Sequence, residues 1–334
     1  MKKVGIHIIF ITTVLVLIQC RKKEGEFQYV YDPTPYQLNL PSNFPPMPIP
    51  ADNPLTDQGV LLGRHLFWDT RLSGDNSMAC AHCHLPELGF ADSAKFSIGI
   101  QGLPGTRQSM PLQNLAYANN YFWDGRSITL EEQVLLPVED PIEMHANWPN
   151  VISKLKEDER YIKLFYEAFG VTKIDSAYAA KALAQFLRTM VSGNSKYDKV
   201  IRKEEKFTKM EQKGYDLFKK HCTSCHKEPL LTSNSFENNG LALDTTLNDF
   251  GRMKITQNSK DSLKFKVPTL RNIEFTFPYM HDGRFKTLEE VLDFYSTGVH
   301  TCANVDSKMG YAYQKGVKLS KEEKKDIIAF LNTL

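Results

Sequence analysis

The sequence predicts an all-α protein with long loops, built from two related domains. Four pairs of Ser or Thr and a Glu three residues later have the spacing of a helix capping box, namely Thr129 and Glu132, Thr208 and Glu211, Thr287 and Glu290, and Ser320 and Glu323. No run of useful length alternates between apolar and polar residues, as a half-buried strand would. Two motifs occur twice in the same order, which indicates two domains of one kind.

The composition is that of a folded protein without a strong charge preference. The chain has 334 residues, of which 42% are hydrophobic, so it can bury a sizeable core, and its length favours two domains over one. Lysine and arginine number 41 against 39 acidic residues, which leaves a net charge of +2. These values fit neither bulk disorder nor a basic binding surface, so we expect no nucleic-acid partner.

The first residues have the features of an export signal. Lys2 and Lys3 precede an apolar run over residues 4–18 that is too short for a good membrane-spanning helix. We therefore expect a signal peptide over residues 1–19 and a periplasmic location. The run ends at Cys20, as in the cleavage box of bacterial lipoproteins, although Gln19 is a poor match to that box. A lipid on Cys20 that attaches the protein to a membrane is the favoured interpretation, and an ordinary signal peptide with an incidental cysteine is the alternative.

The segment that follows is predicted to be a lipid-anchored tether over residues 20–54. Eight prolines lie between Pro33 and Pro54, together with asparagine, tyrosine and lysine residues. Such a composition favours an extended spacer over a regular helix or strand.

Two short motifs carry the clearest chemical signal. Each has two cysteines separated by two residues and followed directly by a histidine, which is the pattern of covalent haem attachment. The residues are Cys80, Cys83 and His84 in the first motif and Cys222, Cys225 and His226 in the second. A thioredoxin-like pair or a zinc site does not need that histidine, so we expect two covalently bound haem c groups with His84 and His226 as iron ligands. Cys302 is left over and is expected to be a free, inert thiol.

A second motif also occurs in both halves of the chain. Residues 124–132 match residues 282–290 at an offset of 158, and a proline-containing turn that ends in Asn precedes each copy. We therefore expect two cytochrome c-like domains, each around one covalent haem. The boundaries are placed at residues 55–200 for the N-terminal domain and 201–334 for the C-terminal domain.

Apolar periodicity adds two helices to those indicated by the capping boxes. Residues 176–191 place Ala180, Leu183, Ala184 and Leu187 on one helix face. The apolar residues between 327 and 334 do the same after the capping box at Ser320. Both helices are amphipathic, so each is expected to pack against a domain core.

Several further motifs follow one another along the chain, namely Leu62-Gly63-Arg64, Asp69–Gly74 before the first haem motif, Phe122–Arg126, Val267–Asn272 and His281-Asp282-Gly283. In this order they resemble the motifs of bacterial di-haem cytochrome c peroxidases and the related MauG-like oxidases. The resemblance runs from about residue 55 to the C-terminus. It implies that the N-terminal haem reacts with peroxide and that the C-terminal haem transfers electrons.

The resemblance also implies three catalytic residues. Trp123 matches the tryptophan between the two haems, and Gln133 and Glu143 match the glutamine and glutamate of the peroxide pocket. A carboxylate whose pKa is tuned by its pocket can move a proton from one peroxide oxygen to the other. By itself Glu143 would read as a solvated loop acid and Trp123 as a core residue, and the family spacing favours the catalytic roles.

Two positions depart from the common family pattern. Ile100 stands where many members have a histidine that blocks the peroxidatic iron, so we expect the oxidised protein to react with peroxide without prior reduction. Tyr295 stands where the usual peroxidases have a methionine ligand of the C-terminal haem and MauG-like proteins have a tyrosine. A phenolate ligand favours ferric iron and lowers the potential. Met309 is the alternative ligand, and His145 and His300 are expected to serve outside the iron sites.

A calcium ion between the domains is a further implication of the resemblance. Thr276 and Pro278 match the positions whose backbone carbonyls bind the ion. Gln108 stands where the family has an asparagine, and its side-chain carbonyl is also a suitable oxygen ligand for a hard cation.

These observations lead to one favoured function and two alternatives. The favoured function is a peroxidase that reduces hydrogen peroxide to water with electrons from a small redox protein such as a cytochrome c or a cupredoxin. The first alternative is a MauG-like oxidase that uses peroxide to oxidise a partner protein, and the second is a di-haem electron carrier with both irons closed. The oligomeric state, including a homodimer, is left open by the sequence.

Overall fold

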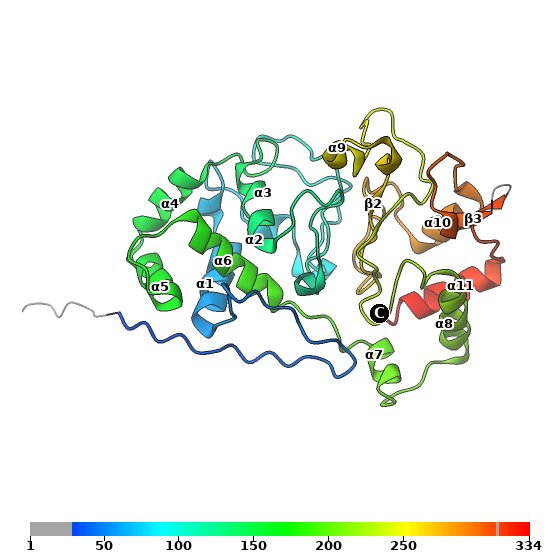
Figure 1. Cartoon of the computed structure of the whole chain (residues 1–334), viewed down its shortest axis with the longest axis horizontal. Coiled ribbons are helices and arrows are strands. Elements are labelled where there is room, and N and C mark those ends of the chain that lie inside the picture. Colours follow the sequence, from blue (N-terminus) through cyan, green and yellow to red (C-terminus); the bar gives the residue numbers. More distant parts are fainter. Residues whose placement is uncertain (1–28, 312–313) are drawn as a thin grey trace, which may run out of the picture.

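The computed structural model describes residues 29–311 and 314–334, and it has two helical halves that lie side by side (Figure 1). The expected signal peptide and Cys20 lie outside the described residues. Long loops connect the helices, and the described strands are only two residues each. The predicted helix-rich architecture with long loops is therefore confirmed. No described helix is both long and apolar enough to cross a membrane.

The N-terminal half holds the first six α-helices. They are α1 (Asp57–Phe67), α2 (Leu130–Gln133), α3 (Leu136–Glu139), α4 (Trp148–Lys156), α5 (Glu159–Phe169) and α6 (Ser176–Arg188). The predicted helix over 176–191 is confirmed as α6, which Asp175 caps by accepting a hydrogen bond from the Tyr178 backbone N–H. Sequence periodicity did not single out α1, although Thr56 caps it in the same way. One apolar core lies among these helices.

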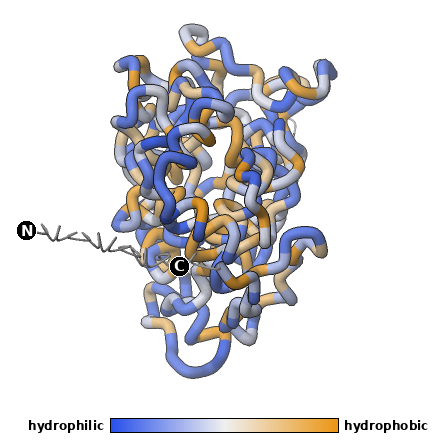
Figure 2. The backbone as a smooth tube through the Cα atoms, turned by 90° about the vertical axis from the view of Figure 1, so that its left-hand side faces the viewer, coloured by the Kyte–Doolittle hydropathy of each residue, from blue (hydrophilic) through white to orange (hydrophobic). Residues whose placement is uncertain are grey.

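Within the described residues, the C-terminal half has five α-helices and two short antiparallel ladders. The helices are α7 (Lys196–Ile201), α8 (Lys209–His221), α9 (Met253–Thr256), α10 (Leu288–Asp293) and α11 (Lys321–Leu331). The strands are β1 (Phe236–Glu237) with β2 (Phe265–Lys266), and β3 (Gly310–Tyr311) with β4 (Gln314–Lys315). A second apolar core lies among α8, α10 and α11. In Figure 2 the apolar residues gather toward the inside of the view, while polar residues follow the outer loops.

Each half has one close helix crossing that depends on a glycine. Helices α1 and α6 approach so closely at Gly63 that a Cβ atom there would lie 1.9 Å from the backbone oxygen of Ala182. Helices α8 and α11 do the same at Gly214, where a Cβ atom would lie 1.8 Å from the backbone oxygen of Asp326. Any side chain would force the helices apart, because packed helices have no space for it. The helix before each haem motif is therefore held against the last long helix of its half.

The four predicted capping boxes are confirmed. Thr129, Thr208, Thr287 and Ser320 each accept a hydrogen bond from the backbone N–H of the Glu three residues later, and that Glu reaches back to the cap backbone. The capping boxes of the duplicated motif start α2 in one half and α10 in the other. The same sequence pattern therefore builds the same local structure twice.

The described part of the predicted tether, residues 29–54, is extended and lies along both halves. Its backbone pairs with the start of α1, where Tyr36 N–H donates to Leu55 O at 3.1 Å. Asn43 Nδ2 donates to Asp198 Oδ1 at 2.9 Å, and the Phe44 ring lies 4.9 Å from the Arg271 guanidinium carbon. This stretch is thus packed on the protein surface (the blue segment in Figure 1).

Candidate active site

The first haem motif begins in a single 3-10 turn, Cys80–His82, and continues to a half-buried His84. The Nδ1 atom of His84 donates to the backbone oxygen of Phe90 at 2.9 Å. That hydrogen bond leaves Nε2 as the free ring nitrogen, which is the usual arrangement of a metal-ligating histidine. Burial raises the pKa of the Cys80 thiol to about 12 and that of Cys83 to about 11.

The second haem motif begins where α8 ends, with Cys222 as the C-terminal cap of the helix. The Nδ1 atom of His226 donates to the backbone oxygen of Leu231 at 3.1 Å, so Nε2 is again free. Burial lowers the pKa of His226 to about 4, which keeps its ring neutral and able to bind a metal. Two thiols and one oriented neutral histidine in each half fit a covalent haem c, which needs those groups.

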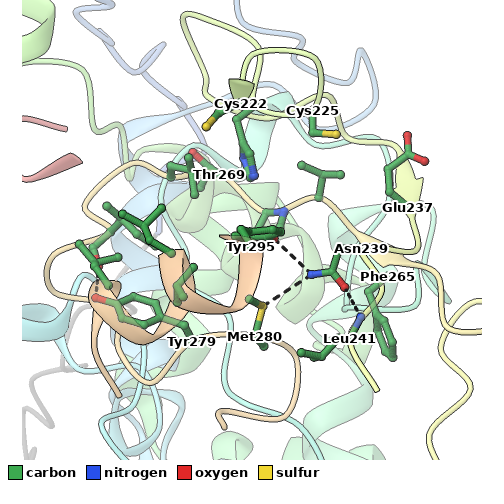
Figure 3. A pocket seen from close by; sticks show the side chains of 18 of the residues that line it. Cys222, Cys225, Glu237, Asn239, Leu241, Phe265, Thr269, Tyr279, Met280 and Tyr295 are labelled. Carbon is green, nitrogen blue, oxygen red and sulfur yellow. Dashed lines mark hydrogen bonds between the residues drawn. The ribbon is translucent and has the colours of Figure 1, made fainter. Parts of the chain in front are cut away.

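A mostly apolar pocket lies directly below the second motif (Figure 3). Figure 3 shows Cys222 and Cys225 at one end of the pocket with Tyr295 below them, and His226 also lines the pocket. Apolar walls around a few polar groups are typical of cofactor sites, and a haem is a large flat apolar group. The pocket therefore suits the haem that its cysteines would attach.

Tyr295 belongs to a π-helical turn, Phe294–Gly298, that continues α10. Its hydroxyl accepts a hydrogen bond from Asn239 Nδ2 at 3.2 Å. Burial raises the pKa of Tyr295 to about 12, the Asn239 hydrogen bond acts in the opposite direction, and Cys225 and Cys222 raise the pKa further. π-Helical turns often occur at functional sites, because the extra residue re-aims a side chain.

Two methionines line the same pocket as Tyr295. Met309, the alternative ligand, lines the pocket from a short 3-10 turn, Ser307–Met309. Met280 also lines it, with its sulfur 3.8 Å from the donor Asn239 Nδ2. The sequence did not point to Asn239, because it lies 56 positions before Tyr295 in a loop without a recognisable motif.

Trp123 is buried between the two halves and lines the C-terminal pocket. Its indole N–H donates to the backbone oxygen of Gln108 at 2.9 Å. Its ring meets the His281 ring edge-on, with the centroids 6.5 Å apart, and the Phe265 ring stacks on the other side of His281 at 3.6 Å. The indole is therefore fixed both by a hydrogen bond and by packing.

Glu143 lies in the turn after α3, close to the first haem motif. Burial raises its pKa to about 7, Asp140 raises it further, and Arg126 acts in the opposite direction. The Glu143 charge adds a smaller increase to the pKa values of Cys80 and Cys83, which burial raises most. A solvated loop acid would have no such shift, so the half-buried position distinguishes Glu143 from that alternative.

Gln133 is the last residue of α2 and is half-buried. Its side-chain amide makes no hydrogen bond to other residues in the described ranges, so its donor and acceptor are available. The backbone N–H of Ile100 donates to the Glu143 backbone oxygen at 2.9 Å. The residue that replaces the blocking histidine thus helps to hold the turn of Glu143.

The three residues expected to bind calcium line one pocket together. Gln108, Thr276 and Pro278 all face the space beside Trp123, and both Gln108 and Thr276 are buried. The Gln108 backbone N–H donates to the His281 oxygen at 2.8 Å, while its own backbone oxygen receives the Trp123 indole. The Gln108 peptide therefore connects the loops of the two halves.

The remaining sequence candidates lie away from these pockets. His145 and His300 are both exposed, and neither lines the pocket of Tyr295. Cys302 is an exposed free thiol. Lys266, which the sequence did not single out, is buried in the Trp123 pocket and donates to the backbone oxygen of Asn120. Burial lowers the pKa of Lys266 to about 8.

Comparison with known proteins identifies relatives along most of the chain. The pattern of the family of di-haem cytochrome c peroxidases matches residues 57–206. The methylamine utilization protein MauG of Methylorubrum extorquens is 37% identical over 294 residues, which cover 86% of this chain and 81% of that protein. The cytochrome c peroxidase Ccp of Escherichia coli is 35% identical over 327 residues, which cover 96% of this chain and 66% of that protein.

A solved structure shares the architecture over most of the chain. The crystal structure of a MauG-like protein associated with microbial copper homeostasis superposes with a TM-score of 0.82 at 33% identity, and the match covers 90% of this chain and 95% of that one. The chain therefore belongs to the family of di-haem cytochrome c peroxidases, and it is an oxidoreductase that acts on hydrogen peroxide with two haem c groups.

Proposed function

We propose that the protein reduces hydrogen peroxide to water at the haem of the N-terminal half, which Cys80 and Cys83 attach and His84 ligates. Peroxide takes up two protons and two electrons and leaves as two water molecules. When bound, the haem supplies the iron at which peroxide is reduced. The observation that carries the proposal is the half-buried Glu143, whose pKa of about 7 suits both accepting and releasing a proton at neutral pH.

The residues of the N-terminal half have separate tasks in this proposal. The Glu143 carboxylate accepts the proton of one peroxide oxygen and passes it to the other oxygen, which then leaves as water. The free side-chain amide of Gln133 orients the peroxide by a hydrogen bond. Ile100 offers no atom that binds iron, so peroxide has access to the oxidised protein.

The decisive experiment replaces the Glu143 carboxylate without changing its shape. Glu143→Gln should lower the rate of the reaction with peroxide by about a hundredfold to ten-thousandfold, which is the usual contribution of a general acid–base group. Glu139→Gln is the matched control, because Glu139 is an exposed acid at the end of α3 in the same segment. Stopped-flow spectra of the oxidised protein give the rate. Equal rates for both variants would contradict the proposal.

Electrons for this reaction would arrive through the C-terminal half. Cys222, Cys225 and His226 would hold the second haem, and a small redox protein such as a cytochrome c or a cupredoxin would reduce it. Trp123 borders this pocket and lies on the boundary with the N-terminal half. Its fixed ring provides a packed route for electrons from one haem to the other.

A second candidate function is the oxidation of a partner protein, as in MauG-like oxidases. Tyr295 favours it, because this buried phenol faces the pocket of Cys222 and His226 and holds a hydrogen bond from Asn239. A phenolate ligand would lower the potential of the C-terminal haem. Such a haem would accept electrons poorly from ordinary cytochromes c and would share oxidising equivalents with the other half through Trp123.

Substitution of Tyr295 separates the two candidate functions. If Tyr295 binds the iron, Tyr295→Phe should change the spectrum of the C-terminal haem, and Tyr295→Met should raise its potential and improve turnover with reduced cytochrome c. Tyr279→Phe is the control, because Tyr279 lines the same pocket but its hydroxyl donates to the Ile273 backbone oxygen at 3.0 Å. An unchanged spectrum in Tyr295→Phe would exclude Tyr295 as the ligand, make Met309 the next residue to replace and favour the plain peroxidase.

Two further parts of the proposal concern calcium and the membrane. The Gln108 side chain and the backbone carbonyls of Thr276 and Pro278 would bind one calcium ion beside Trp123. Cys20 would carry a lipid that anchors the exported protein in the periplasm, ahead of the packed segment 29–54. Incorporation of labelled lipid that persists in Cys20→Ala would contradict the anchor.

A further inference from the structure

The sequence has three tryptophans, and only one of them is exposed. Trp123 and Trp148 are 8% and 5% exposed, whereas Trp68 is 45% exposed. Trp68 is the C-terminal cap of α1, and its ring packs edge-on against the buried rings of Phe67 at 4.6 Å and Phe186 at 5.6 Å. One face of this indole is therefore in the core and the other is in solvent.

The buried side of Trp68 is connected to the first haem motif by aromatic rings in contact. Phe67 meets the Phe90 ring edge-on with centroids 6.3 Å apart, and Phe67 is almost fully buried. The backbone oxygen of Phe90 accepts the hydrogen bond from His84 Nδ1. Packed rings and one hydrogen bond thus lead from His84 to the surface.

We infer that Trp68 is a redox-active surface residue through which the N-terminal half takes electrons from a small reductant in solution. This inference rests on the proposed reduction of peroxide at the His84 side. Reduction of one peroxide to two water molecules takes two electrons and two protons, and Trp68 passes the electrons inward one at a time through Phe67 and Phe90. Each time, the indole N–H proton passes to water, and a small one-electron reductant in solution, such as a phenol, then gives up one electron and one proton and restores Trp68. Two such turns oxidise two phenols and supply the two electrons and two protons that peroxide takes up.

Trp123 and Trp68 would then serve two different electron routes. Trp123 leads to the C-terminal half, and its indole N–H is held by the Gln108 oxygen. Trp68 leads to solvent. The route through Trp68 gives the protein an outlet for oxidising equivalents when no redox protein occupies the C-terminal half.

The test exposes the oxidised haem protein to stoichiometric peroxide without a reductant. Peptide mass spectrometry should then find oxygen added to Trp68 several times more often than to the buried Trp148. Met210, which is 51% exposed, reports direct oxidation by free peroxide. In Glu143→Gln, oxidation of Trp68 should fall while oxidation of Met210 stays unchanged.

A radical measurement gives an independent readout. Electron paramagnetic resonance of freeze-quenched samples should show an organic radical that is weaker in Trp68→Phe and unchanged in Trp148→Phe, the matched control. Phenylalanine keeps the ring contacts of Trp68, and the haem absorption spectrum verifies that the variant is folded.

The outcomes distinguish this inference from the proposed function. If the haem bands respond to peroxide while Trp68 stays unmodified and the radical is insensitive to Trp68→Phe, the inference is wrong and the peroxidase proposal stands. Oxidation of Trp68 that persists in Glu143→Gln although the reaction of the haem with peroxide is slowed would also overturn the inference. Haem bands that do not respond to peroxide at all would contradict the proposed function and the inference together.

Discussion

Trp123 and His281 occupy the same place in two copies of one loop, at the offset of 158 residues that relates the halves. In both copies the residue before them and the glycine after the Asp have positive φ, with values of 65° and 69° at Phe122 and Gly125. A backbone bridge closes each loop, and the Asp pairs with the Arg two residues later. The two copies of the loop therefore have the same backbone conformation. They differ in the side chain at the equivalent position, which is Trp123 in one copy and His281 in the other.

The segments after the repeated loop make the larger difference. After α2 the N-terminal half continues through α3 into a tight turn that carries Glu143, whose charge acts on the Cys80 and Cys83 thiols. After α10 the C-terminal half continues into the π-helical turn that carries Tyr295. One half thus places an acid with a pKa of about 7 near its haem motif, and the other places a phenol. The two halves can share the repeated loop and still differ in chemistry, because Glu143 and Tyr295 lie on the segments that follow it.

The largest expected effect comes from replacing Trp123, the side chain that distinguishes the N-terminal copy of the loop from the C-terminal copy. Trp123→Phe should slow electron transfer between the halves strongly, because the phenyl ring loses the indole hydrogen bond to Gln108 and is far harder to oxidise. The reaction of the N-terminal half with peroxide should persist, and turnover with a reduced donor protein should be lost. Trp148→Phe is the control, because the buried Trp148 belongs to the N-terminal core. Unchanged donor turnover in Trp123→Phe would contradict a relay role.

The pH dependence sharpens the contrast between Glu143 and Tyr295. Burial favours the neutral form of Glu143, so the carboxylate that accepts the peroxide proton forms only as the pH rises through about 7. The rate with peroxide should therefore rise with pH and level off above 7, and it should fall about tenfold for each pH unit well below 7. Stopped-flow rates between pH 5 and pH 9 measure it. A rate that is independent of pH in this range would exclude Glu143 as the proton acceptor.

The smallest expected effect tests whether the capping boxes of the two repeated motifs contribute equally to the stability of the protein. Thr129 Oγ1 accepts from the Glu132 N–H at 3.1 Å, and Thr287 Oγ1 accepts from the Glu290 N–H at 3.2 Å. Replacing either threonine by alanine should cost about 1 kcal/mol of stability. Urea unfolding of the haem protein measures both, with Thr172→Ala in an exposed loop as the control. A cost in one half only would show that the copies differ in stability as well as chemistry.

The family spacing located Glu143 and Trp123, but their surroundings came from packing. Glu143 alone would read as a solvated loop acid, and only the contact of the turn with the loop of Ile100 and with Gly74 places it in a half-buried position. Asn239 had no sequence signal, because its partner Tyr295 lies 56 positions later. The extended segment 29–54 was expected to be a tether, and its packing against Asp198 and Arg271 depends on contacts more than 150 residues away in the chain.

The sequence by itself determined the features whose causes are local. Haem attachment needs two thiols and a histidine at fixed spacing, and a capping box needs a hydroxyl and a carboxylate three residues apart, so both can be read from adjacent positions. Only the tertiary structure decided which side chains meet across the chain, such as Trp68 against Phe67 and Phe186, or Asn239 against Tyr295. The physical reason is that burial and long-range contacts arise from the packing of whole segments, and no single stretch of sequence contains them.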